Sequence, residues 1–235
     1  MKTLLDREDL VFNPPELGCV LYLPGLPGGG SKIYDRSPYG TPGSITGAAW
    51  KRLPSGLWCL NFDGTDDKVT VTSGGLDGIT DSFTVKVWFK KDANKGIGAI
   101  FIKNSYTFSI VTEAIGGVGT TAHIRCYVGG TNYEDFVVRP LSIVNPTVWL
   151  CFGLTYDGTT ARVYKNGQAH TANTSAGKSA AATGAMYIGR FEPGGGYEFP
   201  GDIAILQIIR GTVWTELDFQ NSFNREKHLF GVWSR

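Results

Sequence analysis

The feature of this sequence that most constrains its fold is a run of alternating apolar and polar side chains in the segment Trp58–Lys91. The apolar members of the run share one face: Phe83, Val85, Val87 and Phe89. This period of two predicts a strand with one buried face that begins near Ser82. Upstream, residues 58–71 predict two shorter strands joined by an acidic turn at Asp63-Gly64.

A second segment, residues 147–170, predicts antiparallel neighbours. Residues 148–154 alternate in the same way, Asp157-Gly158 turns the chain, and Asn166-Gly167 is the dipeptide typical of a type I′ hairpin. Two turns this close together require strands that run in opposite directions. The following run, 170–184, is rich in Ala, Ser, Thr and Gly and predicts a surface loop.

The last part of the sequence predicts a central strand and a helix. In residues 203–209 both faces are apolar, with Ile203, Ile205 and Ile209 on one and Ala204, Leu206 and Ile208 on the other. Such a strand belongs in the middle of a sheet, covered by loops or an arm. Thr215 followed by Asp218 predicts a capping box that opens a short helix ending near Lys227.

Several of these segments, in this order, resemble one known family. They are LNFDGTDDKVTV with DSFTVKVWFKKD, then VWLCFGLTYDGTTARVYKNGQ, MYIGR and FPGDIAILQIIRGTVWTELDF. Together they resemble a LamG-like jelly roll, of the laminin G and pentraxin-related branch of the concanavalin A-like lectins and glucanases. The resemblance covers roughly Gly18 to Phe219. It implies an all-β, two-sheet antiparallel jelly-roll sandwich in a single domain, residues 18–235, with an extended N-terminal arm and a short C-terminal helix.

The arm is residues 1–17, which match nothing in that family. Asn13-Pro14-Pro15 favours an extended path and withholds backbone donors. An arm of this kind contacts a neighbouring subunit or straps its own sandwich, and both alternatives stay open. The candidate subunit contacts are Phe12, Asn13, Pro14 and Pro15.

Composition excludes several classes of partner. The sequence has 235 residues, 32 of them Gly and 11 Pro, which suits an all-β protein with tight turns. A net charge of +1 without a basic run predicts no nucleic-acid partner. The charged residues 6–9 and the lack of a long apolar stretch predict neither export by a signal peptide nor membrane insertion. The four cysteines are expected to be buried free thiols, with one disulfide as the alternative: Cys19, Cys59, Cys126 and Cys151.

Catalysis is not expected. Glucanases that share the sandwich place their acids in the pattern ExDxxE, so that two carboxylates face the sugar, and this pattern is missing from the sequence. The three histidines lie in unrelated segments, without a nucleophile motif beside them.

Calcium is the cofactor that the resemblance implies. The acidic positions that match the family are Asp35, Asp63, Asp66 and Asp67, with Asp202 displaced from the usual place in the closing strand. Where the family has an acidic pair in that strand, this sequence has Ala204 and Ile205. The alternative is that these aspartates only form turns.

Glycan binding would need exposed aromatic rings beside hydrogen-bonding groups. The candidates are Trp88, Asn132, Tyr133, Tyr197 and Phe199. The alternative for Trp88 is burial beneath a crossing loop, and the alternative for Tyr197 and Phe199 is that they anchor a Gly-rich loop.

These observations predict a non-enzymatic structural or binding protein. The first hypothesis is a bacteriophage virion surface component, a capsid decoration or a tail-associated adhesin, made in the host cytoplasm and bound to capsid or tail subunits or to itself as a homo-oligomer. The alternative is a free lectin-like module that binds cell-surface glycans with or without calcium. A glycoside hydrolase is the third hypothesis.

Overall fold

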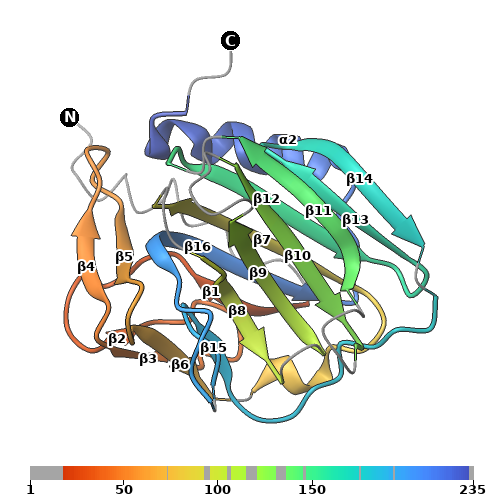
Figure 1. Cartoon of the computed structure of the whole chain (residues 1–235), viewed down its shortest axis with the longest axis horizontal. Helices are drawn as coiled ribbons and strands as arrows, with labels where there is room; N and C mark the ends of the chain where they lie inside the picture. Colours follow the sequence, from red (N-terminus) through yellow and green to blue (C-terminus); the bar gives the residue numbers. More distant parts are fainter. Residues whose placement is uncertain are drawn as a thin grey trace.

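We analysed the protein as a computed structural model. It describes residues 18–72, 74–92, 96–104, 107–114, 121–130, 136–144, 147–174, 176–192 and 194–232. The predicted arm, including Phe12, Asn13, Pro14 and Pro15, lies outside these residues. The fold is a sandwich of two antiparallel sheets with a C-terminal helix, as the sequence predicts (Figure 1).

The first sheet has eight strands. Its order is β14 (Gln168–Thr174), β13 (Thr160–Lys165), β12 (Leu150–Tyr156), β7 (Phe83–Lys91), β16 (Pro200–Arg210), β5 (Trp58–Asp63) and β4 (Ala49–Arg52), and β1 (Cys19–Leu23) also pairs with β16. The closing strand β16 therefore lies in the middle of this sheet. Residues 170–174 belong to β14, so the predicted surface loop starts later than expected, although all of β14 is exposed.

The second sheet also has eight strands. Its order is β11 (Phe136–Val144), β10 (Thr121–Val128), β9 (Phe108–Ala114), β8 (Gly98–Lys103), β15 (Met186–Ile188), β6 (Lys68–Val71), β3 (Gly43–Thr46) and β2 (Lys32–Ile33). A short 3-10 helix, η1 (Gly75–Gly78), connects β6 to β7. In Figure 1, β9 and β10 lie in front of β7 and β16, which shows the two layers.

The core lies between the two sheets. The alternating face of β7 points into it, as its pattern predicts, and Phe83 meets Phe108 of the opposite sheet with ring centroids 5.0 Å apart. All four cysteines are buried free thiols, as expected. The burial of these large apolar side chains supplies the main driving force for the sandwich.

A β-bulge in β16 changes the facing predicted for its residues. The register of β16 against β7 shifts between Ala204 and Leu206, and Ile205 has a positive φ of 39°. Since a bulge adds one residue, it inverts the alternation beyond it. The side chains in the core between the sheets are therefore Ile203, Leu206 and Ile208, and those on the outer face are Ala204, Ile205 and Ile209. The prediction that Ile203 shares a face with Ile205 and Ile209, and Ala204 with Leu206 and Ile208, is wrong.

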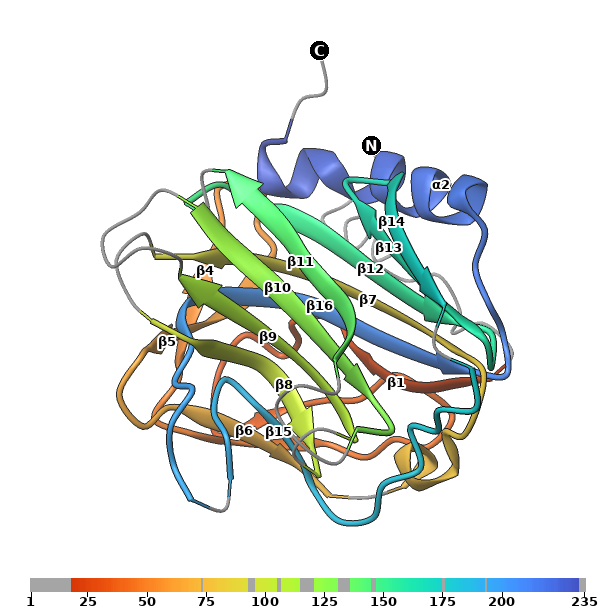
Figure 2. The ribbon, with the colours of Figure 1, turned by 45° about the vertical axis from the view of Figure 1, so that its right-hand side comes forward.

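The outer face of the first sheet is covered by the C-terminal helix α2 (Glu216–Glu226) and the 3-10 turn η2 (Lys227–Phe230) (Figure 2). The predicted capping box at Thr215 is confirmed. Below the helix, the Lys86 ammonium lies 2.5 Å from one carboxylate oxygen of Glu226. The other carboxylate oxygen of Glu226 accepts a hydrogen bond from the Trp88 indole at 2.7 Å. A helix therefore covers β16, where a loop or an arm was expected. The prediction of a single buried face for β7 is wrong, because Thr84, Lys86 and Trp88 on its other face are buried as well. No helix among the described residues has the length and apolar character needed to cross a membrane.

Candidate ligand-binding site

The structure buries some of the predicted glycan-binding residues and places another at the surface. Trp88 is fully buried, with its ring stacked on Phe230 at a centroid distance of 4.0 Å. Phe199 is also fully buried, edge-on to Phe62 and Phe89 in the core. The prediction is therefore wrong for these two rings, because neither can touch a ligand. Asn132 and Tyr133 lie outside the described residues.

Tyr197 is the predicted residue that the structure places in a hollow of the surface. The hollow has a volume of about 220 Å³ and lies on the outer face of the second sheet. Its lining is Ile102, Ser109, Val111, Tyr127, Phe191, Gly195 and Tyr197. The floor comes from β8, β9 and β10, and one wall comes from the loop between β15 and β16, drawn in blue in Figure 2.

The described residues of this loop, 189–192 and 194–199, are held by three backbone hydrogen bonds. The Phe199 amide donates to the Gly189 carbonyl at 2.8 Å, and the Phe191 amide donates to the Gly196 carbonyl at 3.0 Å. The Tyr197 carbonyl accepts from the Ala99 amide of β8 at 2.7 Å. The buried Phe199 ring anchors the end of the loop in the core, so the wall of the hollow is a built structure.

Tyr197 has a backbone conformation that aromatic residues seldom adopt. Its φ is 55°, in the left-handed region, which costs about 1 kcal/mol or more for a residue with a side chain. The hydrogen bonds of the loop hold it there. The ring packs against Phe191 at a centroid distance of 5.8 Å and covers the apolar floor of the hollow.

Six of the seven lining residues were missed by the sequence analysis, and Tyr127, Phe191 and Ser109 show why. Tyr127 is the last member of an alternating run in β10, and that alternation could have placed it on the outer face. Phe191 lies in the same glycine-rich loop as Tyr197. Ser109 has no signal in the sequence, because only the pairing of β9 with β8 and β10 brings it to the hollow.

The calcium prediction fails at Asp35. One carboxylate oxygen accepts from the Tyr22 and Ser37 amides, both at 2.8 Å, and the other accepts from the Ser37 hydroxyl at 2.7 Å and the Thr41 amide at 2.9 Å. A carboxylate has about four acceptor positions, and protein donors fill them all. Asp35 therefore braces the loop between β2 and β3 against the edge of β1 and is not free to bind a metal.

The calcium prediction also fails at Asp202. This buried carboxylate lies 2.8 Å from Lys51 Nζ and 3.1 Å from Lys90 Nζ, and it accepts from the Asn61 amide at 2.8 Å. Burial raises the pKa of Asp202, but the hydrogen bonds from Lys51, Asn61 and Lys90 outweigh it and hold the pKa below its ordinary value. Two ammonium groups at this position repel a cation.

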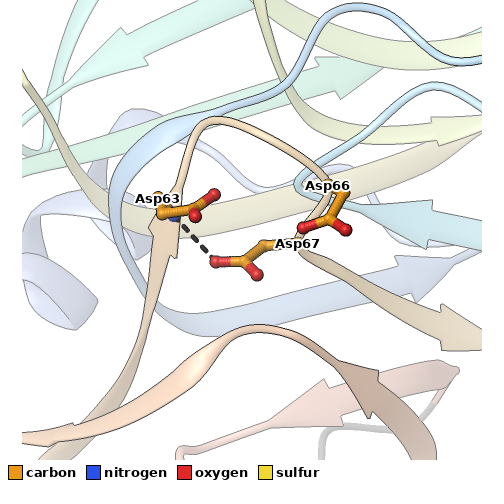
Figure 3. A group of neighbouring side chains, drawn as sticks. All are labelled: Asp63, Asp66 and Asp67. Atoms are coloured by element: carbon orange, nitrogen blue, oxygen red, sulfur yellow. Dashed lines mark hydrogen bonds between the residues drawn. The ribbon is translucent and has the colours of Figure 1, made fainter.

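Asp63 is the predicted metal ligand whose setting still suits a cation. Figure 3 shows it in a turn with Asp66 and Asp67, and one oxygen from each lies within 4.8 Å of the others. The Asp63 amide donates to Asp67 at 2.8 Å, so the cluster is also a hydrogen-bonded turn. Carboxylate oxygens are the ligands that Ca²⁺ prefers. Calcium at this turn stays a prediction.

The thiols are unsuited to nucleophilic chemistry. Burial raises the pKa of Cys59 to about 12, and burial also raises the pKa values of Cys126 and Cys151. Since the thiolate is the reactive form, these cysteines act as small apolar core residues.

The sequence of residues 63–213 matches the model of a protein family, Laminin_G_3, described as the concanavalin A-like lectin/glucanases superfamily. The match covers more than half of the chain. The chain belongs to this superfamily. No curated protein sequence matches it at a significant level.

Solved structures share the superfamily fold at low sequence identity. The binding domain of botulinum neurotoxin DC in complex with rat synaptotagmin II is 13% identical with a TM-score of 0.63, and the match covers 88% of this chain and 51% of that one. A botulinum neurotoxin type C structure, described in terms of two ganglioside molecules, is 14% identical with a TM-score of 0.62 over 88% of this chain and 51% of that one. The chain thus spans about half the length of these neurotoxin structures.

A third solved structure matches nearly from end to end. It is domain 4 of AbnA, an extracellular GH43 arabinanase from Geobacillus stearothermophilus, in complex with arabinotriose. It is 16% identical with a TM-score of 0.62, and the match covers 86% of this chain and 97% of that domain. At these identities the likeness shows the fold alone.

Proposed function

We propose that the protein is a non-enzymatic binding module whose ligand is a glycan. The observation that carries this proposal is the hollow beneath the loop between β15 and β16, with the half-buried Phe191 and Tyr197 rings in its lining. Aromatic rings pack on the apolar faces of sugars, and a phenol hydroxyl can hydrogen-bond a sugar hydroxyl. The left-handed Tyr197, held by hydrogen bonds of its loop, adds a preformed wall.

The chemistry of the lining supports binding over hydrolysis. A glycosidase needs two carboxyl groups on either side of the scissile bond. Among the described residues that line the hollow, none carries a carboxyl group. Two fold neighbours support the same proposal: one was solved in complex with arabinotriose, and the other is described by its interaction with ganglioside molecules.

The test is a glycan array with the purified protein and a Tyr197→Asn variant. Asparagine tolerates a left-handed φ, so the variant keeps the backbone of the loop and removes the ring. We expect glycan binding by the natural protein and at least a roughly fivefold loss in the variant, since an aromatic contact is worth about 1 kcal/mol beyond the area it buries.

The matched control is Tyr34→Asn, which removes a half-exposed tyrosine outside the lining. It should bind as the natural protein does, and both variants should keep a cooperative melting transition. An array without any hit, or a Tyr197→Asn variant that binds normally, contradicts the proposal.

The placement on a bacteriophage virion, as a capsid decoration or a tail-associated adhesin, stays a prediction from the sequence. It is compatible with glycan binding, since an adhesin has to hold a cell surface where glycans are exposed. A virion component contacts other subunits, whereas a free glycan-binding module does not need to. The mass of the protein in solution measures whether its subunits associate.

A further inference from the structure

The wall of the hollow contains a segment with little conformational preference of its own. Residues 194–196 are three glycines with positive φ values of 141°, 71° and 95°. Glycine loses more conformational freedom on folding than any other residue. Tyr197, which follows directly, is itself left-handed. The conformation of the wall therefore depends on the groups that fasten these glycines.

Two carboxylates fasten the glycine segment from either side. Glu198 accepts a hydrogen bond from the Gly196 amide at 2.7 Å. Glu192 accepts one from the Gly194 amide, and its carboxylate lies 2.9 Å from Lys68 Nζ. Hydrogen bonding to Lys68 is the main cause that lowers the pKa of Glu192, so this carboxylate stays charged. Hydrogen bonds from backbone amides to ionised carboxylates are among the stronger ones in proteins.

Arg190 lies between these two carboxylates. Its Nε atom is 3.6 Å from Glu192 and 3.7 Å from Glu198, and it is buried without a hydrogen bond to any described residue. At these distances the attraction is one of charge and not a directed hydrogen bond. The guanidinium also packs on Gly195, where an added Cβ atom would lie 3.0 Å from Nη2, and Nη1 donates to the Asp66 carbonyl at 3.4 Å. One cation thus connects both sides of the glycine segment, and Gly195 itself lines the hollow.

We infer that Arg190 is a positioning residue for the hollow: it is the shared counter-charge of Glu192 and Glu198, and it thereby keeps Tyr197 in place before a ligand arrives. This inference rests on the proposed function, in which the Tyr197 ring contacts a glycan. A ligand that meets an ordered wall does not have to order it, and binding is tighter as a result. Arg190 acts through the loop and does not itself contact the glycan.

The first measurement is amide hydrogen exchange without any ligand, in the natural protein and in Arg190→Gln. The reporter amides are those of Phe191, Phe199 and Ala99, which donate to carbonyls of the loop. We expect their exchange to be at least about tenfold faster in the variant, because the loop opens more often. Exchange in β7 should stay unchanged, which shows that the sandwich is still folded.

The second measurement is the binding curve of each variant on the glycan array that tests the proposed function. Arg190→Gln should bind about three- to tenfold more weakly, because the ligand then has to order the wall. Arg190→Lys keeps the charge and should bind within about twofold of the natural protein. The matched control is Arg162→Gln, which removes a surface arginine paired with Asp157 and should change neither binding nor loop exchange.

A double variant separates this role from a general loss of stability. If Arg190 acts through Tyr197, adding Arg190→Gln to Tyr197→Asn should weaken binding by less than about 1.5-fold. A general loss of stability would weaken binding equally with and without the Tyr197 ring.

The outcomes distinguish the inference from the proposed function. Natural exchange rates at the loop amides, or an Arg190→Gln variant that binds normally, overturn the inference and leave glycan binding in place. An equal loss in both Tyr197 backgrounds overturns the action through Tyr197, and an Arg190→Lys variant as weak as Arg190→Gln overturns the role of charge. An array without any hit overturns the proposed function, whereas the exchange rates still decide whether Arg190 orders the loop.

Discussion

The carboxylates of Asp35 and Asp202 stabilise the sheets and do not bind a metal. Asp35 occupies the place of a strand neighbour at the edge of β1, and Asp202 joins two lysines across the outer face of the first sheet. Both residues are buried, and both have acceptor positions taken by protein donors. An acidic residue that matches a family's metal position can therefore have a purely structural role, which only its neighbours in space reveal.

We predict that Asp202→Asn lowers the free energy of unfolding at pH 7 by about 2 kcal/mol, because charged hydrogen bonds are worth about 1.5–3 kcal/mol. Since the pKa of Asp202 is depressed in the folded state, its contribution is complete above the unfolded pKa of about 4. It is lost as the pH falls through the lower folded pKa.

Urea unfolding at pH 7 and at stepwise lower pH measures this effect. The difference between the natural protein and Asp202→Asn should narrow below about pH 4. Asp66→Asn, an exposed acid of the turn in Figure 3, is the control and should change stability by less than about 0.5 kcal/mol. A difference that stays constant down to pH 2 would contradict the prediction.

At the scale of elements, the sequence predicts what depends on local periodicity and local hydrogen bonds. The alternation in β7, the hairpin at Asn166-Gly167 and the capping box at Thr215 are all found in the structure. The bulge at Ile205 was not predictable, because it arises from pairing with β7, far away in the sequence. Of the residues that line the hollow, the sequence predicted only Tyr197. The floor could not be predicted, because it is formed by three strands that are brought together by the fold.

The cover that α2 forms over the first sheet contains one buried ion pair, Lys86 with Glu226. We predict that Glu226→Gln lowers the free energy of unfolding by roughly 3 kcal/mol, because it leaves the buried Lys86 ammonium without its counter-charge. The side-chain amide oxygen of the introduced glutamine can still accept the hydrogen bond from the Trp88 indole. The decrease in stability therefore measures the loss of the negative charge. The double variant Lys86→Met with Glu226→Gln should recover much of it.

Denaturant unfolding of the single and double variants measures this coupling. Asp157→Asn, which breaks the surface pair with Arg162, is the matched control and should cost less than about 1 kcal/mol. If Glu226→Gln is no more destabilising than this control, the ion pair does not hold the helix.

At the scale of the whole molecule, the fold of a single chain does not determine how many subunits assemble or what they bind. The sandwich was predictable because several segments follow one another in the order typical of the family, and together they are specific even though each is short. The binding partners were not predictable, since the same architecture carries many functions. The homo-oligomer, the capsid or tail contacts and the role of Phe12–Pro15 stay predictions.

We predict that the protein forms a homo-oligomer in solution and that removal of residues 1–17 reduces it to a monomer. Light scattering of the two proteins, with calcium and with chelator, measures the subunit number. Substitution of Pro14 and Pro15 by alanine is a milder test, since it frees the backbone that the prolines restrict. A monomer at every concentration, or an oligomer that survives the truncation, would contradict the prediction.

The central position of β16 bears on how the chain reaches this state during synthesis. β1, β5 and β7 leave the ribosome long before the strand that pairs with all three of them. Until residue 210 has emerged, each has an unpaired edge and the first sheet cannot close. Contacts this distant in sequence are slow to form. Nascent chains that stop short of β16 would be exposed to aggregation and would depend on chaperones.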